Sequence, residues 1–431
     1  MKNPVETFMI RSRFFLLCLI YGGLPIFAPH WHGILLFCFG SVWLLSTPRS
    51  KLLPRLNGEE YEIRYFLFSI LGWVGLSALG LLFSNDLNKS LHGLESMIPF
   101  FALPWILFQT VEMKDSRKAT TFLLFFAAGV ILLNLASLAF ISYNLWDPVN
   151  LQSNIILANN ALVKIHPVFL SLYISFCIFL IVDQFFPLNT ADRKRVGWIL
   201  FGLIILITYL LWINSRTGII SFFLASIPYI FLKYKSKRRA LAYATLLMIG
   251  ILILIIPFSK KRFLDSPLAA LQGMQVDMSD KNLAPLLARK QIFDCSLELL
   301  KRREIFFGYG TGDSREEMRL CYLSKGYTYP YQEDLDSHNE YFSQLHDHGI
   351  GGLMLFFLLL LIPLRYALKY KSPLLIAFIV LFASTALFEN VLSAQKGVTF
   401  FALICPLLML LAKRQNMAVE NGKPPRFPFE N

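Results

Sequence analysis

Long apolar runs recur from one end of the chain to the other, separated by short polar segments. The runs are continuous and lack the period-two alternation of strands in a membrane barrel, so they predict α-helices that cross a membrane. Several runs are shorter than the ~20 residues that an upright span needs, and we expect their ends to extend or the helices to break. The twelve predicted spans are Phe14–Phe27, Gly33–Ser46, Tyr65–Phe83, Met97–Val111, Thr120–Ile141, Pro167–Val182, Gly197–Ile213, Gly218–Leu232, Ala240–Phe258, Gly349–Leu364, Pro373–Leu387 and Val398–Ala412.

One polar segment, from Ser259 to His348, is far longer than the other connections. It holds 90 residues, with 12 basic and 14 acidic side chains, and is too polar to lie in lipid. A loop of this length in an otherwise compact chain commonly carries function. We therefore divide the chain into four parts: nine spans in residues 1–258, the large loop in 259–348, three spans in 349–412 and a tail in 413–431.

The large loop contains two predicted helices. Apolar residues recur at helical spacing between Leu283 and Leu300, and Pro285 suits the first turn of that helix. A second helix is expected to start near Ser337, whose hydroxyl could cap it, and to run toward the tenth span. Between the two, the segment "GYGTGD" resembles a phosphate loop only loosely and is typical of a tight turn.

Two of the six cysteines, Cys295 and Cys321, lie in the large loop. An oxidising compartment would permit a disulfide between them. Spacing alone does not show whether their geometry allows one.

Composition agrees with the pattern of spans. The chain has 431 residues, of which 55% are hydrophobic and only 16% charged, and its mean hydropathy is +0.54. With the N-terminus on the inner side, the inner loops and termini carry 25 of the 41 Lys and Arg residues, while the short outer loops carry 4 and the large outer loop 12. This asymmetry is the positive-inside pattern. The net charge of +13 therefore reports topology, and no nucleic-acid partner is needed to explain it.

Arg216, in the segment "INSRTGIIS", is the first candidate for chemistry. It falls on a short outward turn between two apolar spans, where a side chain that snorkels to the interface is the simpler interpretation. Against that interpretation, Ser215 and its neighbours surround the arginine with hydrogen-bonding groups, and ionisable residues at membrane depth commonly mark function. A guanidinium can bind phosphate oxygens two at a time. Arg289, on the first helix of the large loop, is a second candidate, although a solvated helix face would also explain it.

His338 and Asn339 open a stretch that holds three histidines before the tenth span. The other two, His346 and His348, are two residues apart and would point in different directions on a helix. No HExxH pattern or other zinc signature is present, so the spacing argues against a metal site, and we expect no cofactor. A lone histidine at a membrane surface is commonly structural. From the residues alone, an outward site with Arg and His side chains suits an enzyme acting on an anionic lipid head group, or a transporter of such a lipid.

Two motifs carry a resemblance to a known family. His338-Asn339, nine further residues, Gly349, two residues and Gly352 resemble the signature of bacterial O-antigen ligases. The segment "NSRTG" before the eighth span is similar to the second marker of the O-antigen ligase and O-antigen polymerase superfamily, and the long outer loop lies between the two motifs as it does there. The motifs themselves cover residues Asn214 to Gly352, and the pattern of spans extends the resemblance over most of the chain.

The resemblance implies an all-α polytopic membrane protein of the GT-C type in the bacterial inner membrane, with cytoplasmic termini, a large periplasmic loop and a periplasmic active site. It implies a metal-independent, inverting glycosyltransferase. The expected donor is a glycan linked to undecaprenyl pyrophosphate, and the expected acceptor is a hydroxyl of lipid A-core or of a growing glycan. Membrane lipids are the other expected partners.

The resemblance also gives the candidate residues their roles. Arg216 and Arg289 would clamp the pyrophosphate as negative charge develops on it. His338 would take the acceptor's proton or bind phosphate as a cation. Glu389, after the eleventh span, could orient an Arg or His side chain or be a solvated carboxylate. Tyr341, three residues after His338, would share its helical face and line the site, or pack in the core.

Asn339 and Ser215 complete the predicted substrate contacts. The 11-residue interval from His338 to Gly349 favours a ligase over a polymerase that uses the same donor. The alternative of another class is a transporter or flippase of glycolipids, which would use arginines along an internal pathway. The unusual charges gather on one outward side, which favours chemistry at that face.

Overall fold

The computed structural model describes residues 4–47, 61–82, 84–110, 113, 115–144, 151–186, 192–255, 284–301 and 305–420. Within these ranges the regular structure is helical and no β-strand occurs. The helices are α1 (Pro4–Gly23), α2 (Pro29–Ser46), α3 (Tyr61–Gly80), α4 (Leu87–Gln109), α5 (Ser116–Asn144), α6 (Leu151–Val163), α7 (Pro167–Phe185), α8 (Arg193–Ile213), α9 (Arg216–Lys233), α10 (Ser236–Ile255), α13 (Ala284–Lys301), α14 (Ser314–Ser324), α15 (Thr328–Gln332), α16 (Glu340–Lys369), α17 (Pro373–Ala386) and α18 (Gln395–Glu420). The first part of the predicted large loop, residues 259–283, and the end of the tail, residues 421–431, lie outside the described ranges.

Each of the twelve predicted spans overlaps a helix, so the all-helical prediction is confirmed for the described residues. The predicted number of membrane spans is not confirmed. In the described part of the chain, eight helices are long and apolar enough to cross a membrane, and two shorter apolar helices cover Trp31–Ser46 and Pro373–Ala386. The eight are Tyr61–Gly80, Leu87–Gln109, Ser116–Tyr143, Pro167–Phe185, Arg193–Ile213, Arg216–Lys233, Glu340–Lys369 and Gln395–Met417.

Several helices extend beyond the apolar runs that predicted them. Helix α4 begins at Leu87, well before the run from Met97, because the Asp86 side chain accepts a hydrogen bond from the Lys89 amide and caps it at 3.0 Å. Helix α6 was not predicted: it lies between the fifth and sixth predicted spans, in a segment whose several Asn residues are typical of loops. Ser137 and Asn159 explain the difference, because a buried hydrogen bond of 2.7 Å between them joins α6 to α5.

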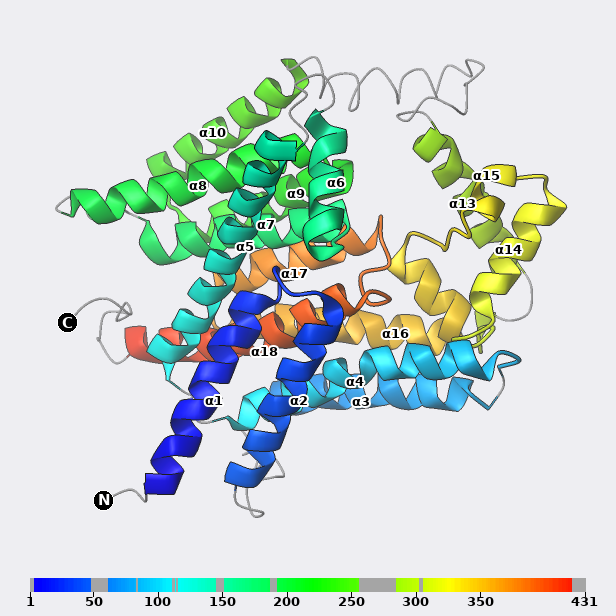
Figure 1. The fold of residues 1–431 in the computed structure, drawn as a ribbon, viewed down its shortest axis with the longest axis horizontal. Helices are drawn as coiled ribbons and strands as arrows, with labels where there is room; N and C mark the ends of the chain where they lie inside the picture. Colours follow the sequence, from blue (N-terminus) through cyan, green and yellow to red (C-terminus); the bar gives the residue numbers. More distant parts are fainter. Residues whose placement is uncertain are drawn as a thin grey trace.

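Helices α7 and α18 form the centre of the bundle, since most of their side chains are buried. Helices α3, α4, α16 and α18 run side by side in Figure 1. Aromatic rings fill the space between central helices: Tyr173 and Phe400 have ring centroids 4.7 Å apart, and Phe382 and Phe401 are equally close. Pairs of this kind add about 0.5–1.5 kcal/mol beyond the area that they bury, which suits a core where lipid removes most of the hydrophobic driving force between helices.

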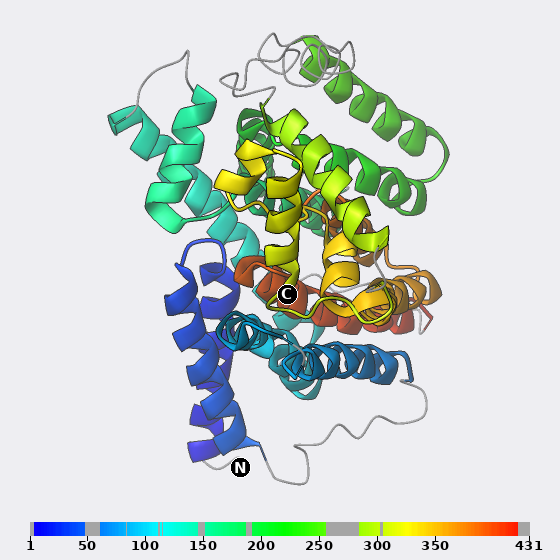
Figure 2. The ribbon, with the colours of Figure 1, turned by 90° about the vertical axis from the view of Figure 1, so that its right-hand side faces the viewer.

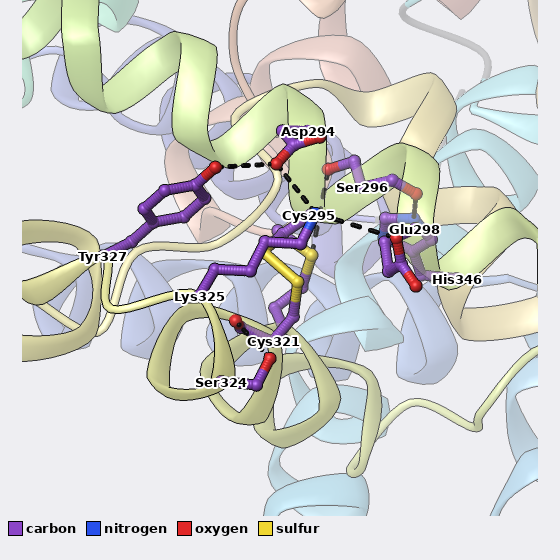
Figure 3. The surroundings of a disulfide bond; sticks show 10 residues. Asp294, Cys295, Ser296, Glu298, Cys321, Ser324, Lys325, Tyr327 and His346 are labelled. Atoms are coloured by element: carbon purple, nitrogen blue, oxygen red, sulfur yellow. Dashed lines mark hydrogen bonds and ion pairs between the residues drawn. A yellow bond between two sulfur atoms is a disulfide. The ribbon is translucent and has the colours of Figure 1, made fainter.

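Helices α13, α14 and α15 form a small layer over one end of the bundle (Figures 1 and 2). The predicted helix Leu283–Leu300 is confirmed as α13, and its periodic face packs into a separate apolar core, lined by Ala288, Ile292, Cys295, Leu299, Met318, Cys321 and Tyr322. The Cys295–Cys321 disulfide, which spacing left open, is present, with Cα atoms 5.8 Å apart (Figure 3). Beside it, the Asp294 carboxylate accepts hydrogen bonds of 2.8 Å from Lys325 and Tyr327. The pKa of Asp294 is accordingly lowered, first by the Lys325 hydrogen bond.

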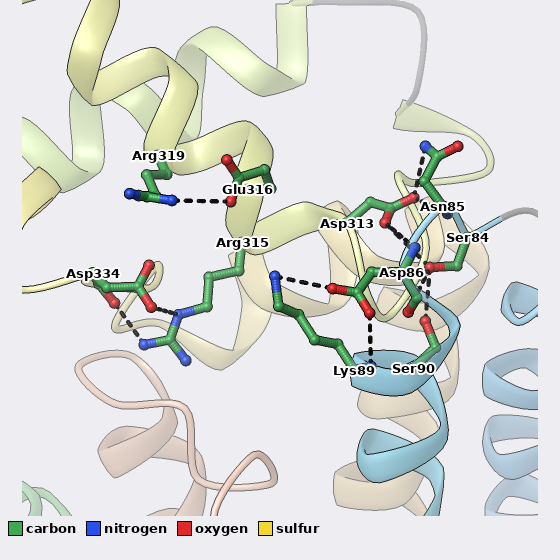
Figure 4. Close-up of polar contacts among 10 residues, drawn as sticks. All are labelled: Ser84, Asn85, Asp86, Lys89, Ser90, Asp313, Arg315, Glu316, Arg319 and Asp334. Carbon is green, nitrogen blue, oxygen red and sulfur yellow. Dashed lines mark hydrogen bonds and ion pairs between the residues drawn. The ribbon is translucent and has the colours of Figure 1, made fainter.

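The "GYGTGD" segment is a turn, as predicted, and it docks the α13–α15 layer onto the bundle. The amides of Tyr309 and Gly310 donate to the carbonyl oxygens of His346 and Asp347. At its end, the Asp313 carboxylate accepts hydrogen bonds from the α3–α4 connection, including one of 2.8 Å from the Asn85 amide (Figure 4). The amides of Tyr309 and Gly310 and the Asp313 carboxylate are therefore engaged by the protein.

Helix α16 begins inside the predicted large loop, and Ser337 does not cap it. Asn339 is the cap: its Oδ1 accepts from the amides of Tyr341 at 2.9 Å and Phe342 at 3.2 Å. Ser337 was the wrong choice because its hydroxyl donates instead to the carbonyl of Asn339 and to the side chain of Asn390. The helix breaks once, at Gly349, where φ is 64° and ψ is −157°, a backbone conformation that only glycine adopts readily.

Candidate active site

The ends of α7, α9, α16 and α17 meet beneath the α13–α15 layer. The last turn of α17 lies against the start of α9, where Thr385 donates to Ser221 at 3.2 Å. The first turn of α7 also lies there, because a Cβ at Gly218 of α9 would collide with Ser171. Arg289 of α13 and the segment before α16 reach the same place. Residues far apart in sequence are thus brought to one end of the bundle.

His338 and Glu389 form the centre of this arrangement. The His338 Nδ1 lies 2.8 Å from Oε2 of Glu389, and the Glu389 side chain is only 10% exposed. Burial lowers the pKa of His338, but the hydrogen bond and charge of Glu389 and the charge of Asp336 outweigh it, so the pKa is raised above 6.5. Burial likewise raises the pKa of Glu389, and the contact with His338 outweighs it, so the net direction is downward. A carboxylate that is ionised can only accept, so Nδ1 carries the proton and Nε2 is the atom available to a substrate.

The four residues Ser337 to Glu340 hold the loop between α17 and α18. Asn339 donates to the carbonyl of Leu387 at 3.0 Å, and Ser337 donates to the side chain of Asn390 at 3.2 Å. Glu340, fully buried, accepts from the amide of Leu392 at 2.8 Å. Together with the His338–Glu389 pair, these hydrogen bonds join four consecutive residues to the six residues from Leu387 to Leu392. The position of Glu389 is therefore determined by the motif that contains His338.

The two predicted arginines both reach this site. Arg289 is half-buried, and one of its terminal nitrogens donates to the carbonyl of Phe388, next to Glu389, at 3.0 Å. Its charge acts on Arg216, His338 and Glu389, so each of these three groups lies within electrostatic range of Arg289. Arg216 is half-buried as the first residue of α9. Two guanidinium groups held in range of each other favour an anion between or beside them.

Ser215 and Asn214 build the turn that presents Arg216. Asn214 ends α8 in a left-handed conformation, with φ of 48° and ψ of 39°. Ser215 is buried and caps α9, because its Oγ accepts from the amide of Gly218 at 3.2 Å. Gly218 leaves room for Ser171 of α7, which brings the start of α9 close to the centre of the bundle.

His166 is a member of the site that the sequence motifs did not identify. Its Nδ1 lies 4.0 Å from Oε1 of Glu389, so Glu389 stands between two imidazoles. Burial lowers the pKa of His166 more than the charge of Glu389 raises it. The signal in the sequence was "KIHP", which places the histidine immediately before the proline that starts α7, on the outward side of the predicted topology.

Tyr341 does not share a helical face with His338. His338 lies before the helix, with φ of 43°, and α16 begins only at Glu340. The Tyr341 hydroxyl donates to the carbonyl of Ala383 at 3.1 Å, and its ring packs against Phe356. The side chain therefore joins α16 to α17, which is the packing alternative.

The remaining histidines of the cluster make contacts within the protein. His346 Nε2 lies 3.2 Å from the carbonyl of Ser296 on α13, and His348 Nε2 lies 2.9 Å from the hydroxyl of Ser77 on α3. Both are buried. In the described part of the chain, no group of three or more His, Cys, Asp or Glu side chains is close enough to hold a metal ion.

Comparison with protein families agrees with the resemblance that the two motifs carry. Residues 201–357 match the family model described as O-antigen ligase. This region is similar to that family and covers about a third of the chain. It includes Ser215, Arg216, Arg289 and the segment from His338 to Gly352, whereas His166 and Glu389 lie outside the match and join it only in the folded chain. No curated protein matches the chain.

Proposed function

We propose that this protein is an O-antigen ligase that transfers a glycan from undecaprenyl pyrophosphate to a hydroxyl of lipid A-core on the periplasmic face of the inner membrane. The observation that carries the proposal is the hydrogen bond between His338 and Glu389 beside Arg216 and Arg289, at one end of a bundle of apolar helices. A cluster of cationic side chains at the end of a bundle of apolar helices suits a lipid whose anionic group lies at the interface. The match of residues 201–357 to the O-antigen ligase family model supports a membrane glycosyltransferase.

Arg216 and Arg289 would bind the donor's pyrophosphate. As the acceptor oxygen attacks the anomeric carbon, the bond from that carbon to the pyrophosphate breaks, and its electron pair passes to the leaving phosphate oxygen. Guanidinium groups that are already in place stabilise this developing charge without reorganisation. Pyrophosphate is a good leaving group, so no acid has to protonate it.

His338 would remove the proton of the acceptor hydroxyl through Nε2. Glu389, which accepts from Nδ1–H, would hold the imidazole in the required tautomer and stabilise the imidazolium that forms. The raised pKa of His338 strengthens it as a base, yet it also favours the cation before the acceptor arrives. The same observation therefore favours a second role, in which His338 binds a phosphate oxygen as a cation, and the pH dependence below separates the two.

Asn339, Ser215 and Tyr341 would position the site. The side-chain carboxamide of Asn339 accepts from the first turn of α16 and donates to the carbonyl of Leu387. We therefore assign Asn339 to orienting His338 and Glu389. Ser215 orients Arg216 by capping α9, and Tyr341 fixes α16 against α17.

The test is reconstitution of the full chain in proteoliposomes with lipid-linked glycan and with lipid A-core or a second lipid-linked glycan as acceptor. We expect a glycan–lipid A-core product, whereas lengthening of the lipid-linked glycan would indicate a polymerase instead. His338→Ala should lower the rate by roughly 10²–10⁴-fold, the range for loss of a general base. Arg216→Lys keeps the charge but loses the planar fork and should be severely impaired.

Matched control variants are available on the same surface. His92, which is 87% exposed and pairs with Glu95 in its own helix, gives His92→Ala as the control for the histidine. Lys290, exposed beside Arg289, gives Lys290→Gln as the control for Arg289→Gln. Full activity in His338→Ala, or equal losses in the control variants, would refute the assignment.

A further inference from the structure

Helix α10 leaves an apolar groove on the side of the molecule away from the candidate active site. Among the described helices α10 packs mainly on α9, and Figures 1 and 2 show it at the edge of the bundle. The Tyr243 hydroxyl fastens it there by donating to the carbonyl of Ile227 at 2.9 Å. The groove between α10, α9 and α7 has a volume of about 480 Å³ and a lining that includes Phe179, Phe222, Tyr229, Leu241, Leu246 and Ile249.

The groove has the length of one lipid leaflet. Its lining on α10 runs from Arg238 to Ile249, which is about 16 Å along a helix axis. The hydrocarbon core of a bilayer is about 30 Å thick, so the groove spans roughly half of it. Helix α9 begins at Arg216 in the candidate site and ends at Lys233 near the groove's mouth, about 27 Å away. The Arg238 end of the groove, which we call its mouth, therefore lies toward the opposite membrane surface.

A single cation stands at that mouth. Arg238 lines the groove and is exposed, and no carboxylate among the described residues pairs with it. Its neighbours are used differently: Lys233 pairs with Asp183 at 2.9 Å, and Arg239 donates to the carbonyl of Tyr234 and stacks on Phe231. Lys235 and Lys237 are also exposed, but neither lines the groove.

We propose that this groove binds an acyl chain of an anionic phospholipid from the leaflet opposite the candidate active site, with Arg238 at the lipid's phosphate. An apolar channel of one leaflet's depth fits an acyl chain, and unpaired cationic charge at its open end fits a head group with net negative charge. A polyprenyl donor fits less well, because its pyrophosphate is assigned to the other end of α9. The proposal depends on the membrane placement of α7, α9 and α10 and not on the proposed reaction.

The test uses the full chain in phosphatidylcholine bilayers that contain a trace of phosphatidylglycerol with a photoreactive group on one acyl chain. Phosphatidylcholine with the same photoreactive chain is the lipid control. After irradiation, labelled peptides are mapped by mass spectrometry. We expect phosphatidylglycerol to label the groove-facing residues of α7, α9 and α10 well above the level reached with phosphatidylcholine. Arg238→Gln should reduce the phosphatidylglycerol labelling roughly fivefold, the factor expected for one basic side chain near an anionic head group. Lys237→Gln, next to it but outside the lining, should not.

A second pair of variants tests the groove itself. Thr245 lines the groove and Ala244 does not, and both are exposed, so a tryptophan can be placed at either position without disturbing a buried core. Thr245→Trp should abolish labelling in the groove, and Ala244→Trp should leave it unchanged, with both variants checked for the unfolding temperature of the parent protein. Equal labelling by the two lipids, or loss of labelling on addition of polyprenyl phosphate, would overturn the assignment to an anionic phospholipid.

Discussion

His338 lies in a left-handed backbone conformation, with φ of 43°, and its amide donates to Oδ1 of Asp336 at 2.9 Å. Histidine is one of the few residues other than glycine that are enriched in this region. The turn takes the imidazole out of the helix that follows and toward Glu389. A residue placed one position later would stand on the cap of α16, facing its first amides. The local backbone and the Glu389 contact thus act together to set the direction of Nε2.

The pH dependence of transfer follows from the His338–Glu389 pair. Because Glu389 and Asp336 raise the pKa of His338 above 6.5, a base mechanism predicts a rate that increases as pH rises through that raised pKa. Glu389→Gln removes the main contribution that raises the pKa of His338 and leaves burial, which lowers it. The rise of the transfer rate with pH should therefore occur at lower pH, and the maximal rate should fall. The measurement is the initial rate of glycan transfer by each protein across pH. A rate that decreases as pH rises, and does so at lower pH in Glu389→Gln, would instead identify His338 as a cationic phosphate ligand.

His166 should matter less than His338. Its 4.0 Å contact with Glu389 is long and its side chain is 57% exposed, so the interaction should contribute about 0.2–1 kcal/mol, a factor of roughly 1.5–5 in rate. His166→Asn is therefore expected to reduce transfer within that range and to shift the pH profile slightly, since one neighbour of Glu389 is lost. Lys164→Asn, exposed on the same connection, is the control. A loss as large as that of His338→Ala would mean that His166 itself acts on the substrate.

The sequence was most informative where a motif is contiguous. His338 and Asn339 were identified from their spacing to Gly349 and Gly352. Glu389 was selected as the only acid near the last two spans, and His166 was not selected at all. Both join the site only through the packing of α7, α16 and α17, and no spacing along the chain encodes that packing. Tyr341 shows the converse error, because helical spacing was counted through a residue that lies outside the helix.

At the scale of elements, the break in α16 at Gly349 connects the site to the bundle. A Cβ at Gly349 would overlap the carbonyl group of Phe306, so the glycine permits the loop before Gly308 to lie directly against the helix. A Cβ at Gly352 would likewise collide with the His348 side chain. At Gly351, in contrast, a Cβ would meet only Leu76 at 3.6 Å.

This contrast provides a matched pair of variants. Gly349→Ala places a side chain in a strained conformation and against backbone, and the strain alone should lower the free energy of unfolding by about 1–3 kcal/mol. Gly351→Ala removes flexibility from a helix interior and should leave stability unchanged or raise it by about 0.5–1 kcal/mol. Thermal unfolding in detergent compares the two. Similar unfolding temperatures for both variants would show that the break is not required.

Helix identities were predictable and helix ends were not. Each continuous apolar run corresponds to a helix, because a backbone in lipid must form all of its hydrogen bonds internally. The polar extensions of α4 and α16, and the whole of α6, depend on caps and buried contacts such as Asp86 with Lys89 and Ser137 with Asn159. Such contacts are made between particular side chains, and an apolar pattern does not reveal them.

At the scale of the whole molecule, the two ends of the bundle differ in kind. One end carries the α13–α15 layer, the disulfide and the candidate active site. The other end carries the connection from α9 to α10, where Lys233 to Arg239 include five of the basic residues assigned to the inner side. The positive charge that the sequence assigns to the inner side therefore lies at the end with the proposed lipid groove, and the proposed chemistry lies at the other end.

Labelling from one side of the membrane tests this arrangement. In a Cys38→Ser background, which removes the exposed free thiol, Lys164→Cys and Lys235→Cys place single accessible thiols at the two ends. We expect a membrane-impermeant maleimide added outside cells with a permeabilised outer membrane to label Lys164→Cys directly and Lys235→Cys only after the inner membrane is opened. The positive-inside rule predicts this result, because the topology expected from the sequence assigns 25 of the 41 basic residues to the side of Lys235. The opposite result would place His338 and Arg216 in the cytoplasm. A periplasmic acceptor would then be out of reach, and the proposed ligase reaction would fail while the groove's preference for anionic lipid could still hold.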